Sequence, residues 1–71
     1  MKRDPNIDPA HVGAILRLVD TMTDALGSAR RAAAALEVHP ETIRRARTQK
    51  RLSHVVARQI LAGYRRWKDG G

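Results

Sequence analysis

Residues 28–48 read Ser-Ala-Arg-Arg-Ala-Ala-Ala-Ala-Leu-Glu-Val-His-Pro-Glu-Thr-Ile-Arg-Arg-Ala-Arg-Thr, and this stretch decides the fold. The pattern predicts two short helices joined by a tight turn. Ser28 is suited to cap the first helix, because its hydroxyl can accept a hydrogen bond from a backbone N–H one turn further on. Pro40 is suited to begin the second helix, where a missing N–H leaves no intrahelical bond unmade.

The second of these helices has a narrow apolar side, formed by Ile43 and Ala46. Its other sides are almost entirely arginine. Clustered cations repel one another unless an anion lies close, and Glu41 is the acidic neighbour that this helix offers. An apolar seam with a basic outer surface is typical of a helix that lies in a nucleic-acid groove.

The stretch resembles a helix-turn-helix of the bacterial and phage repressor type. The resemblance is carried by small residues in the first helix, by apolar residues around the turn and by two apolar positions on the second helix: Ala32, Ala33, Leu36, Val38, Ile43 and Ala46. The helix that follows resembles the one that packs behind this motif in small Cro-like domains. Glu37 departs from the pattern, because the turn usually has glycine there, and a non-glycine residue at positive φ costs of order 1 kcal/mol.

The resemblance implies which side chains would contact DNA. On the groove-facing side of the recognition helix, over residues 40–48, the base-contacting candidates are His39, Glu41, Arg44, Arg45 and Thr48. An arginine there could make the two-pronged contact to guanine, the commonest specific pairing. The candidates for phosphate contacts are Ser28, Arg30, Arg31, Arg47, Lys50 and Arg51. Phosphate contacts would fix the register of the complex without reading sequence.

The segment before the motif predicts a long amphipathic helix over residues 9–26. Asp8 is suited to cap it and Gly27 to end it in the left-handed conformation. Its apolar side chains recur at spacings of three and four and form one stripe: Val12, Ile15, Leu16, Val19, Met22 and Leu26. Residues 1–8 are expected to form a flexible arm.

The segment after the motif predicts a last helix over residues 53–67, capped by Ser53, with residues 69–71 as a tail. Its inner side is expected to carry Val56, Ile60, Tyr64 and Trp67, with Ala57 and Leu61 beside them. Gly63 is expected to permit a close helix crossing or a bend. The chain is therefore predicted to be an all-α, four-helix domain over residues 9–68, with a core of Leu16, Val19, Ala33, Leu36, Val38, Ile43, Ile60 and Leu61.

Composition narrows the possible functions. The 71 residues include no cysteine, carry a net charge of +7, and concentrate that charge beyond residue 27, where eleven basic side chains face three acidic ones. This imbalance indicates a surface for a polyanion. No stretch resembles a signal peptide or reaches the roughly 20 apolar residues of a membrane span, so we expect a cytoplasmic, nucleoid-associated protein with no membrane partner.

Catalytic chemistry has little support in the sequence. The three histidines, His11, His39 and His54, lie far apart near predicted helix starts, without the spacing of a metal site. Ser28 and Ser53 are better explained as helix caps than as nucleophiles. We therefore expect no enzyme, no metal, no cofactor and no small-molecule ligand.

The sequence thus predicts a sequence-specific binder of double-stranded DNA that regulates transcription as a phage- or plasmid-type repressor, by promoter occlusion. A homodimer is expected, because one recognition helix reads only a few base pairs. A second reason to expect a homodimer is that the apolar area of five residues is more than one small core would bury: Val12, Ile15, Met22, Tyr64 and Trp67. The alternatives are an architectural or recombination-accessory protein of the excisionase or Fis-like kind, and a module that binds RNA or an acidic protein.

Overall fold

The protein is built from four α-helices. The computed structural model describes residues 6–70, and its helices are α1 (Pro9–Leu26), α2 (Ala29–Leu36), α3 (Pro40–Gln49) and α4 (His54–Gly70). No β-strand occurs between residues 6 and 70, so the prediction of an all-α protein with four helices is confirmed. None of the helices in this range is both long enough and apolar enough to cross a membrane.

Short polar side chains fix where the helices start. Asp8, Ser28 and Ser53 each accept a hydrogen bond from a backbone N–H two or three residues further on, at 3.0, 3.1 and 3.2 Å. These bonds satisfy N–H groups that have no partner inside the helix. Pro9 and Pro40 occupy first helical positions, as the sequence predicts.

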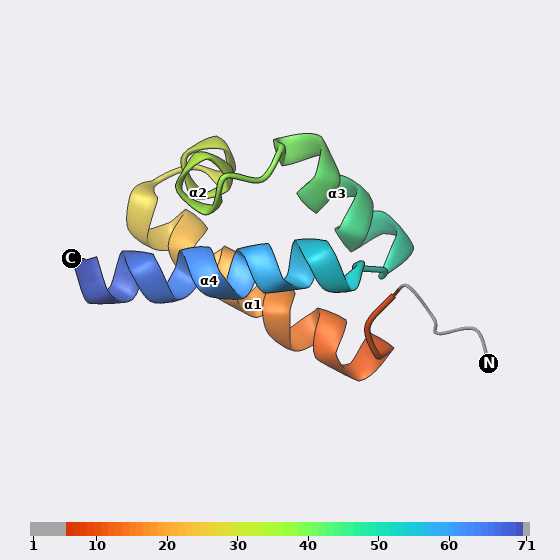
Figure 1. The fold of residues 1–71 in the computed structure, drawn as a ribbon. Helices are drawn as coiled ribbons and strands as arrows, with labels where there is room; N and C mark the ends of the chain where they lie inside the picture. The colour runs from red at the N-terminus through yellow and green to blue at the C-terminus, as the bar shows by residue number, and fades with distance from the viewer. Residues whose placement is uncertain (1–5, 71) are drawn as a thin grey trace.

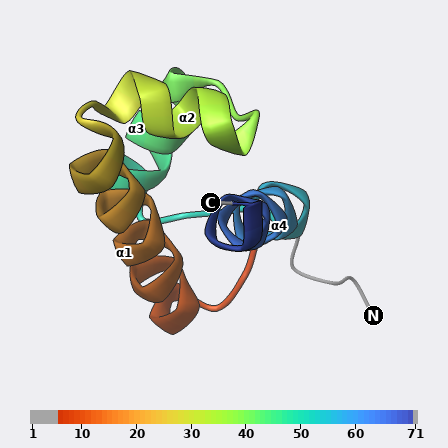
Figure 2. The same cartoon turned by 90° about the vertical axis from the view of Figure 1, so that its left-hand side faces the viewer.

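The helices are arranged so that α1 and α4 pass alongside each other, with α2 and α3 on one side of the pair (Figures 1 and 2). α2 contacts the other three helices, whereas α3 is held chiefly by α2. The molecule measures 42 by 24 by 19 Å along its principal axes. This arrangement leaves the outer side of α3 open to solvent.

The core lies where α1, α2 and α4 meet and extends beneath α3. Its fully buried side chains include Val19, Met22, Leu36 and Ile60. Gly63 of α4 lies directly against Leu36, since a Cβ atom at Gly63 would come within 2.8 Å of the Leu36 Cδ2 and 3.0 Å of its Cα. The glycine therefore permits the close crossing of α2 and α4.

Four predictions about apolar side chains need correction. Leu61, which was expected in the core, is 44% exposed, because the buried side of α4 runs through Ala57, Ile60 and Gly63 instead. Val12, Ile15 and Met22 were expected to be surplus to the core. Each is at most 7% exposed within the single chain, because the long α1 packs against both α2 and α4. Tyr64, Trp67 and Leu16 lie at the core's edge, partly buried.

Two predictions about the chain ends also need correction. The predicted flexible arm includes Asn6 and Ile7, but the Ile7 N–H donates to the Leu52 carbonyl at 2.8 Å and Asn6 forms a bridge with Ser53. Residues 1–5 of that arm lie outside the described range, as does residue 71 of the predicted tail. α4 continues to Gly70, because no proline interrupts its backbone hydrogen bonds.

The turn between α2 and α3 depends on Glu37, which adopts the left-handed conformation with φ of 58°. The Glu37 N–H donates to the Ala34 carbonyl at 3.1 Å, and the Val38 N–H donates to the Ala33 carbonyl at 3.0 Å. These two bonds form a Schellman motif, in which glycine is the usual residue at the left-handed position. Outside the turn, the Glu37 carboxylate pairs with Arg66 of α4 at 3.3 Å.

Two substitutions at Glu37 separate backbone strain from the ion pair. Both Glu37→Ala and Glu37→Gly remove the pair, which is exposed and worth about 0–1 kcal/mol. Only Glu37→Gly also removes the strain of a Cβ at positive φ, of order 1 kcal/mol. We expect the Gly variant to be more stable than the Ala variant by about 1 kcal/mol in urea unfolding. Equal stabilities would mean that the turn is unstrained.

Candidate nucleic-acid interface

The outer side of α3 presents the residues that were predicted to contact bases. α3 buries Ile43 and Ala46, at 6% and 4% exposure, and this fixes its rotation. Because successive residues of an α-helix are rotated by about 100°, the position of these two residues determines which way every other side chain of α3 points. The predicted base-contacting residues are all exposed: His39, Glu41, Arg44, Arg45 and Thr48.

The three arginines of α3 lie on three different sides of the helix. Arg44 points outward, and its guanidinium lies 3.6 Å from the Glu41 carboxylate one turn earlier. Arg45 borders a groove between α3 and the start of α4. Arg47 faces α1, where it pairs with Asp20. The sequence places Arg47 among the phosphate contacts, but the pairing with Asp20, 27 residues away in the chain, gives it an anion within the protein.

His39 is the N-terminal cap of α3. Its Nδ1 accepts a hydrogen bond from the Glu41 N–H at 3.1 Å. A neutral imidazole that accepts at Nδ1 carries its hydrogen on Nε2, so Nε2 remains a donor toward an external acceptor. Glu41 adds a negative charge in the first turn, where it is favourable to the helix dipole.

Replacing His39 tests this cap. His39→Ala should lower the free energy of unfolding by about 0.5–2 kcal/mol, because the Glu41 N–H loses its partner. His39→Asn is the matched control, since asparagine is among the best capping residues and should retain most of that stability. Urea unfolding followed by circular dichroism measures both. Equal losses for the two variants would contradict a capping role for the imidazole.

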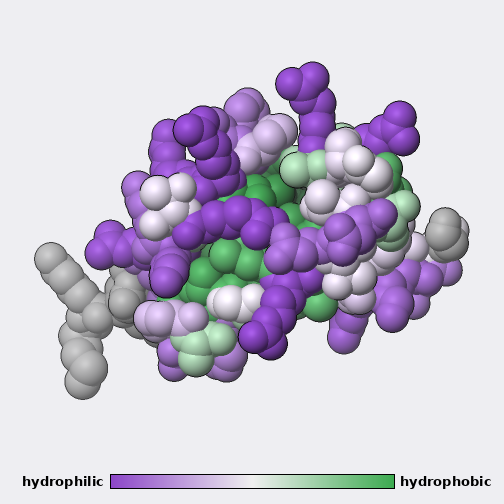
Figure 3. Space-filling model, turned by 180° about the vertical axis from the view of Figure 1, so that it is seen from behind, coloured by the Kyte–Doolittle hydropathy of each residue, from purple (hydrophilic) through white to green (hydrophobic). Residues whose placement is uncertain are grey.

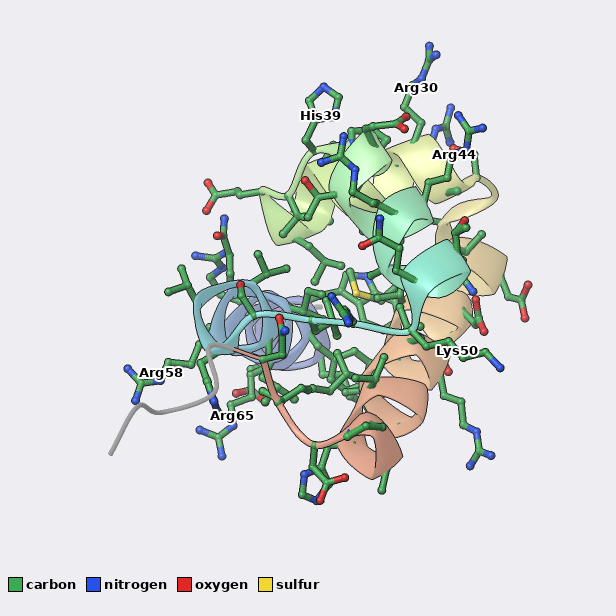
Figure 4. All side chains as sticks on the ribbon, turned by 90° about the vertical axis from the view of Figure 1, so that its right-hand side faces the viewer. Arg30, His39, Arg44, Lys50, Arg58 and Arg65 are labelled. Atoms are coloured by element: carbon green, nitrogen blue, oxygen red, sulfur yellow. The ribbon has the colours of Figure 1, made fainter. Side chains whose placement is uncertain are left out.

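The predicted phosphate contacts divide into separate groups. Arg30 projects to the same side as His39 and Arg44, as Figure 4 shows. The Ser28 hydroxyl accepts from the Arg31 N–H, and the Arg31 guanidinium lies 3.5 Å from the Leu26 carbonyl at the end of α1. Lys50 projects from the other end of α3, toward α1 and away from that side. The structure therefore brings together only part of the predicted set.

The groove between α3 and α4 adds polar residues that were not predicted from the sequence. It encloses about 370 Å³, and Arg51 lies in it together with Arg45. Thr42 and Gln49 line the same groove. The positions 42, 45 and 49 recur at spacings of three and four, so this shared side of α3 could have been recognised from the sequence.

A second groove, of about 390 Å³, lies where α1 meets the end of α3. It is lined by Val12 and Leu16 of α1 and by Arg47 and Lys50. Figure 3 views the molecule from the side that carries α1, and hydrophobic surface shows at its middle with hydrophilic side chains around it. This face differs in character from the basic outer side of α3.

The histidines do not gather into a site for chemistry. His11 and His54 line a small groove between α1 and α4, and His39 is the cap of α3. Within residues 6–70, no three histidine, aspartate or glutamate side chains are grouped so that they could hold a metal ion.

Comparison of the chain with protein families, with curated proteins and with solved structures finds no match, so a proposal for its function stands on its own residues.

Proposed function

We propose that the protein binds double-stranded DNA sequence-specifically and regulates transcription. α2 and α3 form a helix-turn-helix in this proposal, and α3 enters the major groove as the recognition helix. The proposal rests on the contrast between the buried and the exposed sides of α3. Only Ile43 and Ala46 of this helix are buried, while its other sides present exposed basic and polar side chains to solvent.

The residues around α3 support this proposal. Leu36 and Val38 are buried on either side of the left-handed Glu37, which gives α2 and α3 a short and defined connection. Arg30 of α2 faces the same direction as Arg44 of α3, so phosphate and base contacts could form on one duplex (Figure 4). α3 is ten residues long, close to three helical turns. An α-helix has a diameter of about 10–12 Å, which the major groove can admit.

Arg44 is the best-placed base reader. Its guanidinium is exposed and lies 3.6 Å from the Glu41 carboxylate. A guanidinium presents paired N–H donors that match the O6 and N7 acceptors of guanine. Glu41 could in turn accept from a cytosine amino group. The Nε2–H of His39 supplies a further donor for a base or a phosphate.

Selection of bound sequences from a pool of random duplexes tests sequence-specific binding. We expect enrichment of a short motif that contains guanine, because Arg44 favours that base. The Arg44→Ala variant should select a motif in which the guanine is no longer required. Binding without enrichment of any motif would leave only nonspecific or shape-dependent recognition. Preference for single-stranded RNA over every duplex would overturn the proposal.

We also propose that the protein acts as a homodimer on its operator, because two recognition helices double the base contacts. The argument from surplus apolar residues no longer supports a homodimer. Three of the five residues, Val12, Ile15 and Met22, are buried within a single chain. Sedimentation at micromolar concentration, with and without the selected duplex, measures the stoichiometry. A palindromic motif and two chains per duplex are expected, and one chain per duplex would contradict dimeric binding.

Such a protein would repress by occluding a promoter. Within residues 6–70 the structure contains one small helical unit, and the proposed DNA-contacting surface takes up much of one end of it. A reporter placed behind the selected motif tests this step. Repression that is lost in the Arg44→Ala variant is the expected result.

A further inference from the structure

A second basic surface lies on α4, outside the proposed recognition helix. Residues 54, 58, 61, 65 and 68 share one side of this helix, because they recur at spacings of four and three. All five are exposed, and the stripe is His54, Arg58, Leu61, Arg65 and Lys68. None of its residues belongs to the surface around α3. We name this side of α4 the α4 stripe.

The two arginines of the α4 stripe form no ion pair within residues 6–70. The ion pairs formed within residues 6–70 occupy other arginines, which are Arg44, Arg47 and Arg66. Arg58 and Arg65 form none with any described residue. Lys68 lies over the Tyr64 ring at 5.8 Å, which leaves its ammonium at the surface. Unpaired cations held along one helix repel one another, and an external polyanion relieves that repulsion.

The α4 stripe faces away from the proposed recognition surface. In Figure 4, Arg30, His39 and Arg44 project at the top, whereas Arg58 and Arg65 project at the lower left from the far side of α4. The molecule is only 42 Å in its longest dimension. Duplex DNA is stiff over roughly 150 base pairs, so a duplex lying on α3 remains nearly straight across the protein. It would not reach the α4 stripe without a sharp bend.

We infer that the α4 stripe binds the phosphate backbone of a second DNA duplex, so that one protein molecule bridges two DNA segments. This inference rests on the proposed function, because α3 must hold the first duplex. Arg58 and Arg65 lie two helical turns apart, about 10 Å along the axis, and can contact separate phosphates. Because they meet phosphates and not base edges, the second duplex is bound irrespective of sequence.

A capture experiment tests the inference. One duplex, carrying the motif selected by the protein, is fixed on beads, and a fluorescent duplex of unrelated sequence is free in solution. We expect the wild-type protein to retain the fluorescent duplex on the beads at moderate protein concentration. Capture should fall again at large protein excess, since each duplex then becomes saturated separately. That fall distinguishes bridging by one molecule from aggregation of neutralised DNA.

The variant Arg58→Gln/Arg65→Gln removes two charges from the α4 stripe. We expect its affinity for the bead-bound duplex alone to change by less than about twofold, while capture of the second duplex falls by about tenfold or more. Arg17→Glu, on the exposed side of α1, is the matched control because it changes the net charge by the same amount and should keep capture. Arg58→Lys/Arg65→Lys retains the charges and should also keep capture.

Three outcomes would overturn the inference. Wild-type protein that binds the bead-bound duplex but captures no second duplex shows that bridging does not occur, and it leaves the proposed function standing. If the Arg58→Gln/Arg65→Gln variant still captures the second duplex, another surface forms the bridge, such as α3 of a second copy. The α4 stripe would then bind a different partner, such as an acidic protein. Wild-type protein that binds no duplex at all rejects the proposed function together with the inference.

Discussion

Replacing Ile43 with alanine is expected to lower the free energy of unfolding by about 2–5 kcal/mol, because a side chain that is 6% exposed leaves a cavity between α3 and the rest of the core. A domain of this size has few kcal/mol to lose. The variant should therefore be partly or wholly unfolded at 37 °C. Urea unfolding followed by circular dichroism measures the loss.

Val55→Ala is the control for this experiment. Val55 is also an apolar residue on a helix but is 74% exposed, so its truncation should change stability by less than about 0.5 kcal/mol. A loss of only that size for Ile43→Ala would place Ile43 at the surface. The rotation of α3 would then differ from the one described, and the proposed recognition helix would lose its support.

The second large effect is expected on DNA binding, where Arg44 and Arg30 should behave differently. Both are exposed arginines on the same side of the molecule, and Ala at either position removes one positive charge. Arg44→Ala should cost about 1–3 kcal/mol on the selected motif and little on a scrambled duplex, because a base contact is lost. Arg30→Ala should weaken binding to both duplexes alike, because phosphates carry no sequence information.

Salt dependence provides an independent measurement of the same difference. Arg30→Ala should reduce the slope of log affinity against log salt by about one unit, since one fewer counterion is released. Binding of each variant to the motif and to the scrambled duplex, at several salt concentrations, gives both quantities. If Arg44→Ala lowers both affinities equally, α3 does not read bases directly. The architectural alternative, an excisionase-like or Fis-like protein, would then be favoured, and bending of a bound fragment in a gel would be the next measurement.

The positions of the helices follow from the sequence alone, because the signals that start a helix are local. Asp8, Ser28 and Ser53 each cap a helix that begins at the next residue. Pro40 lacks a backbone N–H, and at the first position of a helix that N–H would have no intrahelical partner. The buried side of α3 was also predictable. Ile43 and Ala46 are the apolar residues of a helix whose other residues are polar or charged, apart from the proline at its start.

The rotation of α4, by contrast, was decided in detail by tertiary packing. The sequence placed Ala57 and Ile60 correctly on its inner side, but it also placed Leu61 in the core, because apolar residues lie on more than one side of this helix. Leu36 occupies the space over Gly63, where a Cβ atom would come within 2.8 Å of it. Packing at that contact turns Ala57 and Ile60 inward and leaves Leu61 exposed. It also sets the direction in which Arg58 and Arg65 point.

The pairing of charges was likewise decided by the tertiary structure. Arg47 was expected to be a phosphate contact, but the packing of the helices pairs it with Asp20, which lies 27 residues away in the chain. Local spacing determines which charges share a helix side, and it carries no information about which helices become neighbours. The sequence therefore determined the four helices and the exposed side of α3. Only the packing of α4 against Leu36 and of α3 near α1 decided which arginines form ion pairs within residues 6–70, because those contacts form between residues far apart in the chain.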